Sequence, residues 1–166
     1  MHSLSARQKG LVTGITMILV SIIIYYTKGN FENKLQYVTY SIYTAGIAWT
    51  LFEFSKLKDQ PNKFGTYFSE GFKCFIVVAL LMVIFTAVFL LMQPQLKEEM
   101  AALYKAELVK AGNSTLREID EKISIAKKSF FPSLIMGAIF GYLAIGSLVT
   151  AVVSGFLMQK NKMRQG

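Results

Sequence analysis

The chain has 166 residues, of which 53% are hydrophobic and only 17% are charged, whereas about a quarter of the residues in soluble domains are charged. Its net charge is +8 at pH 7, but the basic residues lie mainly beside hydrophobic segments, where they favour anionic headgroups rather than nucleic acid. With His2 and Cys74 as its only histidine and cysteine, it cannot build a Ser-His-Asp triad, a disulfide or a zinc site. We therefore expect a non-enzymatic membrane protein with no metal, no cofactor and no nucleic-acid partner.

Four apolar segments are predicted to cross the bilayer as helices, because about 20 helical residues span its ~30 Å hydrocarbon core. The third is the surest, since its Leu, Ile, Val and Phe residues favour insertion by about 4 to 8 kcal/mol. Tyrosines and hydroxyl groups interrupt the second, which is the weakest. The predicted fold is an all-α integral membrane domain over residues 1–166, with spans at about 10–27, 35–54, 72–92 and 131–158.

Polar side chains within or beside the second and third spans form a possible intramembrane site. Glu53 is the only acid in a predicted span, and Lys56 lies on the same helical face, so an interfacial ion pair is favoured over an ion- or proton-binding carboxylate. Tyr43 lies deep enough to need a hydrogen-bond partner inside the bundle. Glu70 and Lys73 form a second pair at the entry to the third span.

Residues 95–128 are predicted to form an amphipathic helical hairpin between the third and fourth spans, bracketed by Pro94 and Pro132. Gly112 is placed to end the first helix in a left-handed cap, and Thr115 with Glu118 matches a capping box that begins the second. The apolar stripes must cover the bundle, the lipid surface or another protein. Their residues, which we expect to dock a partner, are Leu96, Met100, Leu103, Leu108, Leu116, Ile119 and Ile123.

Small residues recur at four-residue spacing on the first and fourth spans. This spacing lets helix backbones approach closely, and we favour packing within the chain over dimerisation. The residues concerned are Gly10 and Gly14 on the first span, and Ser133, Gly137, Gly141, Ser147, Ala151 and Gly155 on the fourth.

Two segments carry a family resemblance: "FGTYFSEGFK" from Phe64 to Lys73, and "NSTLREIDEKISIAKKSFFPSLIMGAIFG" from Asn113 to Gly141. With them the chain resembles a four-span membrane family typical of Bacteroidetes, catalogued as domain-of-unknown-function family 4199. The resemblance implies a bacterial inner-membrane location and, as a partner class, envelope glycosylation enzymes that act on lipid carriers. It implies no activity and no site residues.

Orientation is not decided by counting, because nine of the 18 basic residues would lie on each side of a four-span bundle. We favour cytoplasmic termini, since the basic residues on that side crowd the span ends. The leading hypothesis is an accessory or scaffold subunit of a membrane protein complex. The alternative is a small oligomeric transporter or channel, with Glu53 and the face from Tyr43 to Thr50 lining a pathway.

Overall fold

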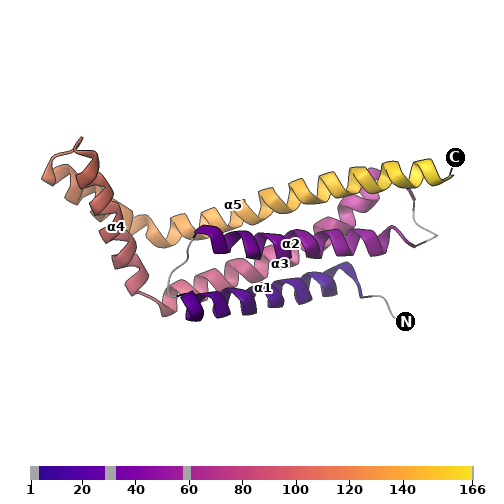
Figure 1. Cartoon of the computed structure of the whole chain (residues 1–166), viewed down its shortest axis with the longest axis horizontal. Helices are drawn as coiled ribbons and strands as arrows, with labels where there is room; N and C mark the ends of the chain where they lie inside the picture. Colours follow the sequence, from indigo (N-terminus) through magenta and orange to yellow (C-terminus); the bar gives the residue numbers. More distant parts are fainter. Residues whose placement is uncertain (1–3, 29–32, 58–60, 166) are drawn as a thin grey trace. The chain divides into compact units, whose positions relative to one another are not determined.

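The computed structural model describes residues 4–28, 33–57 and 61–165. All the secondary-structure elements in these ranges are α-helices, which confirms the predicted all-α class (Figure 1). They are α1 (Ala6–Lys28), α2 (Asn33–Phe54), α3 (Phe64–Met92), α4 (Gln95–Ala111) and α5 (Leu116–Gln165).

Three helical segments of the described chain are long and apolar enough to cross a membrane: Ala6–Thr27, Phe64–Met92 and Leu116–Met163. The second predicted span forms α2 but is not among them, because tyrosines, serine and threonines lower its hydropathy. The third begins at Phe64 rather than at Phe72, because residues 64–71, which precede the predicted span, are part of the same helix.

The chain forms two compact units rather than one domain. The first unit comprises Met1–Met82 and Ile139–Gly166, and the second comprises Val83–Ala138. In the first unit, the beginnings of α1 and α3 and the ends of α2 and α5 lie at one end, here called the basic end (Figure 1). Its core includes Met17 of α1, Tyr43 and Ile47 of α2, and Phe75 and Val78 of α3, all at most 1% exposed.

Glycines allow the helices of the first unit to approach closely. A Cβ atom at Gly10 of α1 would lie 2.6 Å from the carbonyl oxygen of Cys74 on α3, and one at Gly14 would meet Leu81. Gly46 of α2 packs in the same way against Thr13 of α1. The pair Gly10 and Gly14 therefore packs within the chain, as close approach through small residues requires.

The packing face of α5 lies one residue earlier than the predicted small-residue face. Gly146, Thr150 and Ser154 are buried there, and a Cβ at Gly146 would collide with Tyr43 and Phe75. By contrast, Ser133 and Gly137 are exposed, Ser147 and Ala151 are half-buried, and Cβ atoms at Gly141 and Gly155 would meet none of the described atoms within 4 Å. Both registers have small residues every four positions, so spacing alone does not distinguish them.

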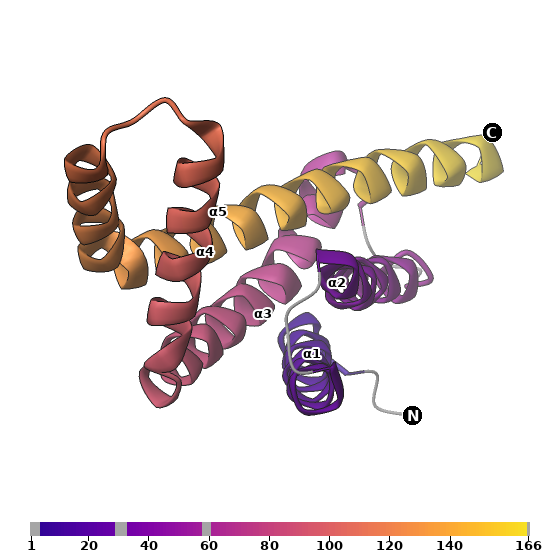
Figure 2. The same cartoon turned by 60° about the vertical axis from the view of Figure 1, so that its left-hand side comes forward.

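The second unit contains a helical hairpin made by α4 and the first part of α5 (Figure 2). Gly112 ends α4 with a φ of 65°, and its N–H donates to the carbonyl oxygen of Val109. At the start of α5 the Thr115 N–H donates to Glu118 Oε2 (2.7 Å), while the Glu118 N–H donates to Thr115 Oγ1 (3.4 Å). The glycine cap and the capping box were thus both predicted from sequence.

Pro132 does not separate two helices, as its position had suggested, because it lies inside the 50-residue helix α5. Proline has no N–H to donate, so it removes one backbone hydrogen bond from the ladder without stopping the chain from resuming helical geometry. The second amphipathic helix and the fourth apolar segment are therefore continuous.

Two ion pairs join the arms of the hairpin: Lys105 with Asp120 (2.9 Å) and Lys127 with Glu98. Of the predicted apolar stripe, Ile119 is 3% exposed, and it is the part of the stripe most fully covered. Leu96, Leu108 and Ile123 are half-buried, whereas Met100, Leu103 and Leu116 are exposed.

The close contact at Gly146 predicts a position-specific response to one added methyl group. Gly146→Ala should lower the melting temperature of the purified chain by a few degrees, because overpacking typically costs about 1 to 3 kcal/mol. Gly155→Ala is the matched control, since it adds the same methyl into open space and gains about 1 kcal/mol of helix propensity. Thermal unfolding followed by circular dichroism checks both, and equal shifts would contradict the assigned face.

The ion pair between Lys127 and Glu98 predicts that acid loosens the hairpin. The hydrogen bond from Lys127 and its positive charge lower the pKa of Glu98. The ion pair therefore stabilises the hairpin fully above the ordinary glutamate pKa of about 4.3. This stabilisation is lost as pH falls through the lowered pKa that Glu98 has in the folded protein. The distribution of distances between spin labels on Ala102 and Ser124 should become broader below the lowered pKa of Glu98.

Glu98→Gln should give the broad distribution already at neutral pH. Glu99→Gln, which alters a neighbouring carboxylate outside the described ion pairs, should behave like the wild type. A distance distribution that stays narrow in Glu98→Gln would show that this ion pair does not hold the hairpin.

Candidate functional site

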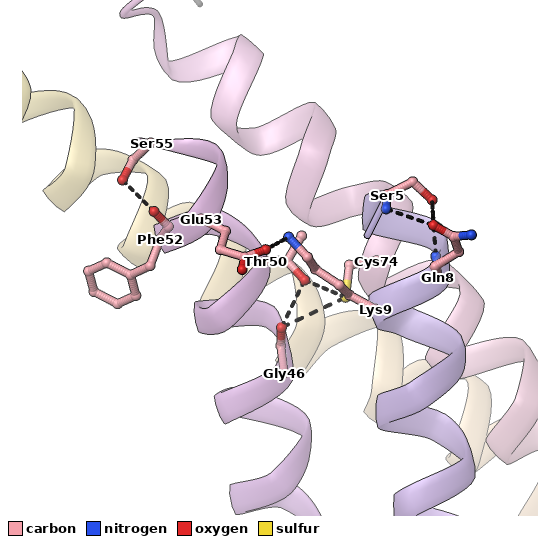
Figure 3. A network of polar contacts seen from close by, with 9 residues as sticks. All are labelled: Ser5, Gln8, Lys9, Gly46, Thr50, Phe52, Glu53, Ser55 and Cys74. Atoms are coloured by element: carbon pink, nitrogen blue, oxygen red, sulfur yellow. Dashed lines mark hydrogen bonds and ion pairs between the residues drawn. The ribbon is translucent and has the colours of Figure 1, made fainter. Parts of the chain in front are cut away.

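A buried lysine is the centre of the polar cluster at the basic end. Lys9 lies in the first turns of α1 and its side chain is 5% exposed, yet it carries an ammonium group. It forms an ion pair with Glu53 near the end of α2, whose side chain is 39% exposed (Figure 3). Lys9 Nζ also lies 5.6 Å from the centre of the Trp49 ring, a cation–π distance. The positive charge of Lys9 is therefore met by a carboxylate and an aromatic face.

Neutral polar groups continue the cluster between α2 and α3. Thr50 Oγ1 lies 2.9 Å from the carbonyl oxygen of Gly46 and 3.3 Å from Cys74 Sγ (Figure 3). On α1, Thr13 donates to the carbonyl oxygen of Lys9 at 2.8 Å. Because Thr50, Cys74 and Thr13 are all buried, these hydrogen bonds satisfy hydroxyl groups that would otherwise be costly inside the unit.

A pocket of about 600 Å³ opens beside this cluster, between α1, α2 and α3. Its apolar wall comes from Leu4, Ala6, Phe54 and Leu57. Its polar wall comes from Ser5, Arg7, Lys9, Thr50, Glu53, Glu70 and Lys73. Ser5 caps α1, since its Oγ accepts from the Gln8 N–H at 3.3 Å and its N–H donates to Gln8 Oε1 at 2.9 Å.

A second ion pair borders the same pocket. Lys73 and Glu70 of α3 lie 2.5 Å apart, and both are partly exposed. Nearby contacts tie the end of α5 to this region: Asn62 donates to the carbonyl oxygen of Met158 at 3.2 Å, and Asn161 donates to Tyr67 Oη at 2.8 Å. These two hydrogen bonds therefore hold the end of α5 against the start of α3, one of the helices that line the pocket.

Three of the four predicted polar residues line this pocket. Glu53, Glu70 and Lys73 do so, whereas Tyr43 is buried elsewhere in the core, where its hydroxyl donates to the carbonyl oxygen of Tyr142 at 3.0 Å. The predicted partner of Glu53 was Lys56, but the ion pair in the structure is with Lys9 on another helix.

Lys9 was missed because a lysine before an apolar run is usually read as an interfacial anchor. Its signal was its helical spacing from Ala6 and Met17, which puts it on the buried face of α1. Helical spacing then predicts that Lys9 and Thr13 share that face.

The chemistry available at the pocket is charge recognition. The lining includes the basic residues Arg7, Lys9 and Lys73 and the acidic residues Glu53 and Glu70, so it carries three positive and two negative charges, a net charge of +1. No group of three or more His, Cys, Asp or Glu side chains is placed to hold a metal among the residues that the structure describes.

The burial of Lys9 predicts a specific pattern in a double-mutant cycle. Glu53→Gln should lower the melting temperature by several degrees, because it leaves a buried ammonium group without its carboxylate. The double variant Lys9→Met/Glu53→Gln should recover most of the loss, since the buried charge is gone. Thermal unfolding of the four proteins in one detergent measures the coupling, and additive losses would argue against a coupled pair.

The similarity to known proteins extends over most of the chain and is not confined to the pocket. A family model described as "Protein of unknown function (DUF4199)" matches residues 8–159, a range that includes α2, α3, the whole hairpin and most of α1 and α5. The pocket residues Leu4, Ser5, Ala6 and Arg7 precede the matched range. No curated protein and no solved structure matches the chain. The matched range covers well over half of the sequence, and the chain belongs to this DUF4199 family.

Proposed function

We propose that this chain is a non-enzymatic accessory or scaffold subunit of a membrane protein complex, and that it docks its partner through the hairpin. The observation that carries this proposal is the apolar surface of the hairpin. On α4, Met100, Leu103 and Tyr104 are 52%, 61% and 40% exposed. They lie at three- and four-residue spacing, so they form one continuous face. Neighbouring exposed apolar residues on one face are typical of an interaction surface.

The charge of the hairpin favours a protein partner over the lipid surface. Residues 95–128 carry seven basic and six acidic side chains, which leaves a net charge of only +1. Helices that lie on anionic membranes are instead rich in Lys and Arg on their polar face. A near-neutral surface with interspersed charges suits docking to a protein.

We further propose four membrane spans, with α2 as the least apolar, in a bacterial inner membrane. The support is the sign of the charges at the basic end, where Lys56 and Lys63 add to the pocket cations Arg7, Lys9 and Lys73, and Lys160 and Lys162 lie near the end of α5. By the positive-inside rule this end is cytoplasmic. A single crossing by α3 then begins the hairpin on the outer side, where envelope glycosylation enzymes are the proposed partner class.

The docking proposal predicts that charge on the apolar face of α4 releases the partner. The chain is extracted in native lipid particles and its complexes are weighed by native mass spectrometry. A second membrane protein at fixed stoichiometry is expected with the wild type and lost with Met100→Glu/Leu103→Glu, because two carboxylates would be buried at the interface.

Ala102→Glu/Val109→Glu is the matched control, since both side chains are exposed and their seven-residue spacing puts them together on another face of the same helix. It adds the same charge and should retain the partner. A wild-type chain recovered alone or as a homomer would overturn the proposal, and so would equal loss in both double variants.

A further inference from the structure

We propose that the pocket at the basic end binds the phosphodiester headgroup of a membrane lipid. The pocket lies between α1, α2 and α3, of which α1 and α3 are apolar enough to cross a membrane. Its volume of about 600 Å³ falls within the range of sites that hold a small organic group. This inference concerns the first unit alone and does not depend on the docking function of the hairpin.

Arg7 is the pocket cation whose positive charge is not neutralised by an ion pair in the described structure. Lys9 is paired with Glu53 and Lys73 with Glu70, but Arg7 forms no ion pair with any carboxylate that the structure describes. It is exposed and lines the pocket. A guanidinium group binds two oxygen atoms of one phosphate through parallel N–H bonds, so phosphate is the anion that this group suits.

The acidic side chains select among phosphates. Glu53 and Glu70 line the same pocket as the three cations, so the lining has a net charge of +1 rather than +3. A phosphodiester carries one negative charge and matches this value. Inorganic phosphate and phosphate monoesters carry about −1.5 to −2 at neutral pH, so they would leave the occupied site with a net charge of about −0.5 to −1. The charge balance therefore favours a diester over the free ion.

The apolar wall explains why the diester would belong to a lipid. Leu4, Phe54 and Leu57 line the pocket beside the charged groups. Leu4 and Leu57 are 42% and 48% exposed, and they offer contact for the glycerol and first methylene groups that follow a headgroup phosphate. Basic pockets between membrane helices are a general means of holding anionic headgroups.

Native mass spectrometry of the full chain in detergent micelles tests this site. Dioleoylphosphatidylglycerol is titrated in, with dioleoylglycerol as the arm that lacks phosphate and inorganic phosphate as the competing free ion. Arg7→Ala removes the unpaired guanidinium and leaves both ion pairs in place. Lys160→Ala is the matched control, because it removes one exposed charge from the same end without touching the pocket.

The wild type and Lys160→Ala should retain phosphatidylglycerol equally, while Arg7→Ala should bind it about tenfold more weakly, as expected for one charge-assisted contact. Dioleoylglycerol should not be retained, and millimolar inorganic phosphate should not displace the lipid.

Equal weakening in both variants would show general attraction to basic surface and overturn the proposal. If dioleoylglycerol bound as tightly as phosphatidylglycerol, the site would not recognise phosphate, and the proposal would be overturned. If inorganic phosphate displaced the lipid, the ligand would be the free ion rather than a lipid. Circular dichroism verifies that each variant keeps its helix content.

Discussion

The ion pair between Lys9 and Glu53 is the interaction on which the basic end of the first unit depends. A lysine side chain that is 5% exposed must have its charge met inside the protein. Only helices held in register can place Glu53 and Trp49 of α2 around it. The close approach of α1 to α3 at Gly10, next to Lys9 in sequence, adds a steric condition to the electrostatic one. The pocket exists because these two conditions fix three helices around a group that cannot be packed by apolar side chains alone.

The two units use different physical means to hold their helices. In the first, glycines and buried hydroxyl groups let backbones approach, and hydrogen bonds such as that from Tyr43 to the Tyr142 carbonyl fix helix pairs. In the second, the hairpin arms are joined by exposed ion pairs around a small apolar seam that includes Ala101 and Ile119. The first arrangement suits an apolar solvent, where packing and hydrogen bonds replace the hydrophobic effect. The second suits contact with water.

Features with local causes could be predicted from the sequence. The cap at Gly112 and the box at Thr115 depend on neighbouring residues, so their geometry followed from the pattern. The continuity of α5 through Pro132 could not be predicted, because proline at that position is compatible with either a helix start or a tolerated gap in the ladder. The register of the α5 packing face could not be predicted either. Gly146, Thr150 and Ser154 recur every four residues, and so do the small residues that directly follow them. At the pocket, the acids were found because charges are rare in the spans, but pairing of Lys9 with Glu53 is a long-range contact that spacing within one helix does not encode.

The face of α5 has a consequence for how this protein is handled. Its small and polar residues Gly146, Thr150 and Ser154 point inward, while Leu148, Val152 and Phe156 are 66%, 65% and 57% exposed. Relative to a water-soluble helix, this segment is inside out. Such an outer surface suits contact with hydrocarbon, and α5 contains one of the three segments that are long and apolar enough to cross a membrane. A change of detergent then changes the layer that contacts this outer surface, so a measured stability applies only to the chain in that detergent.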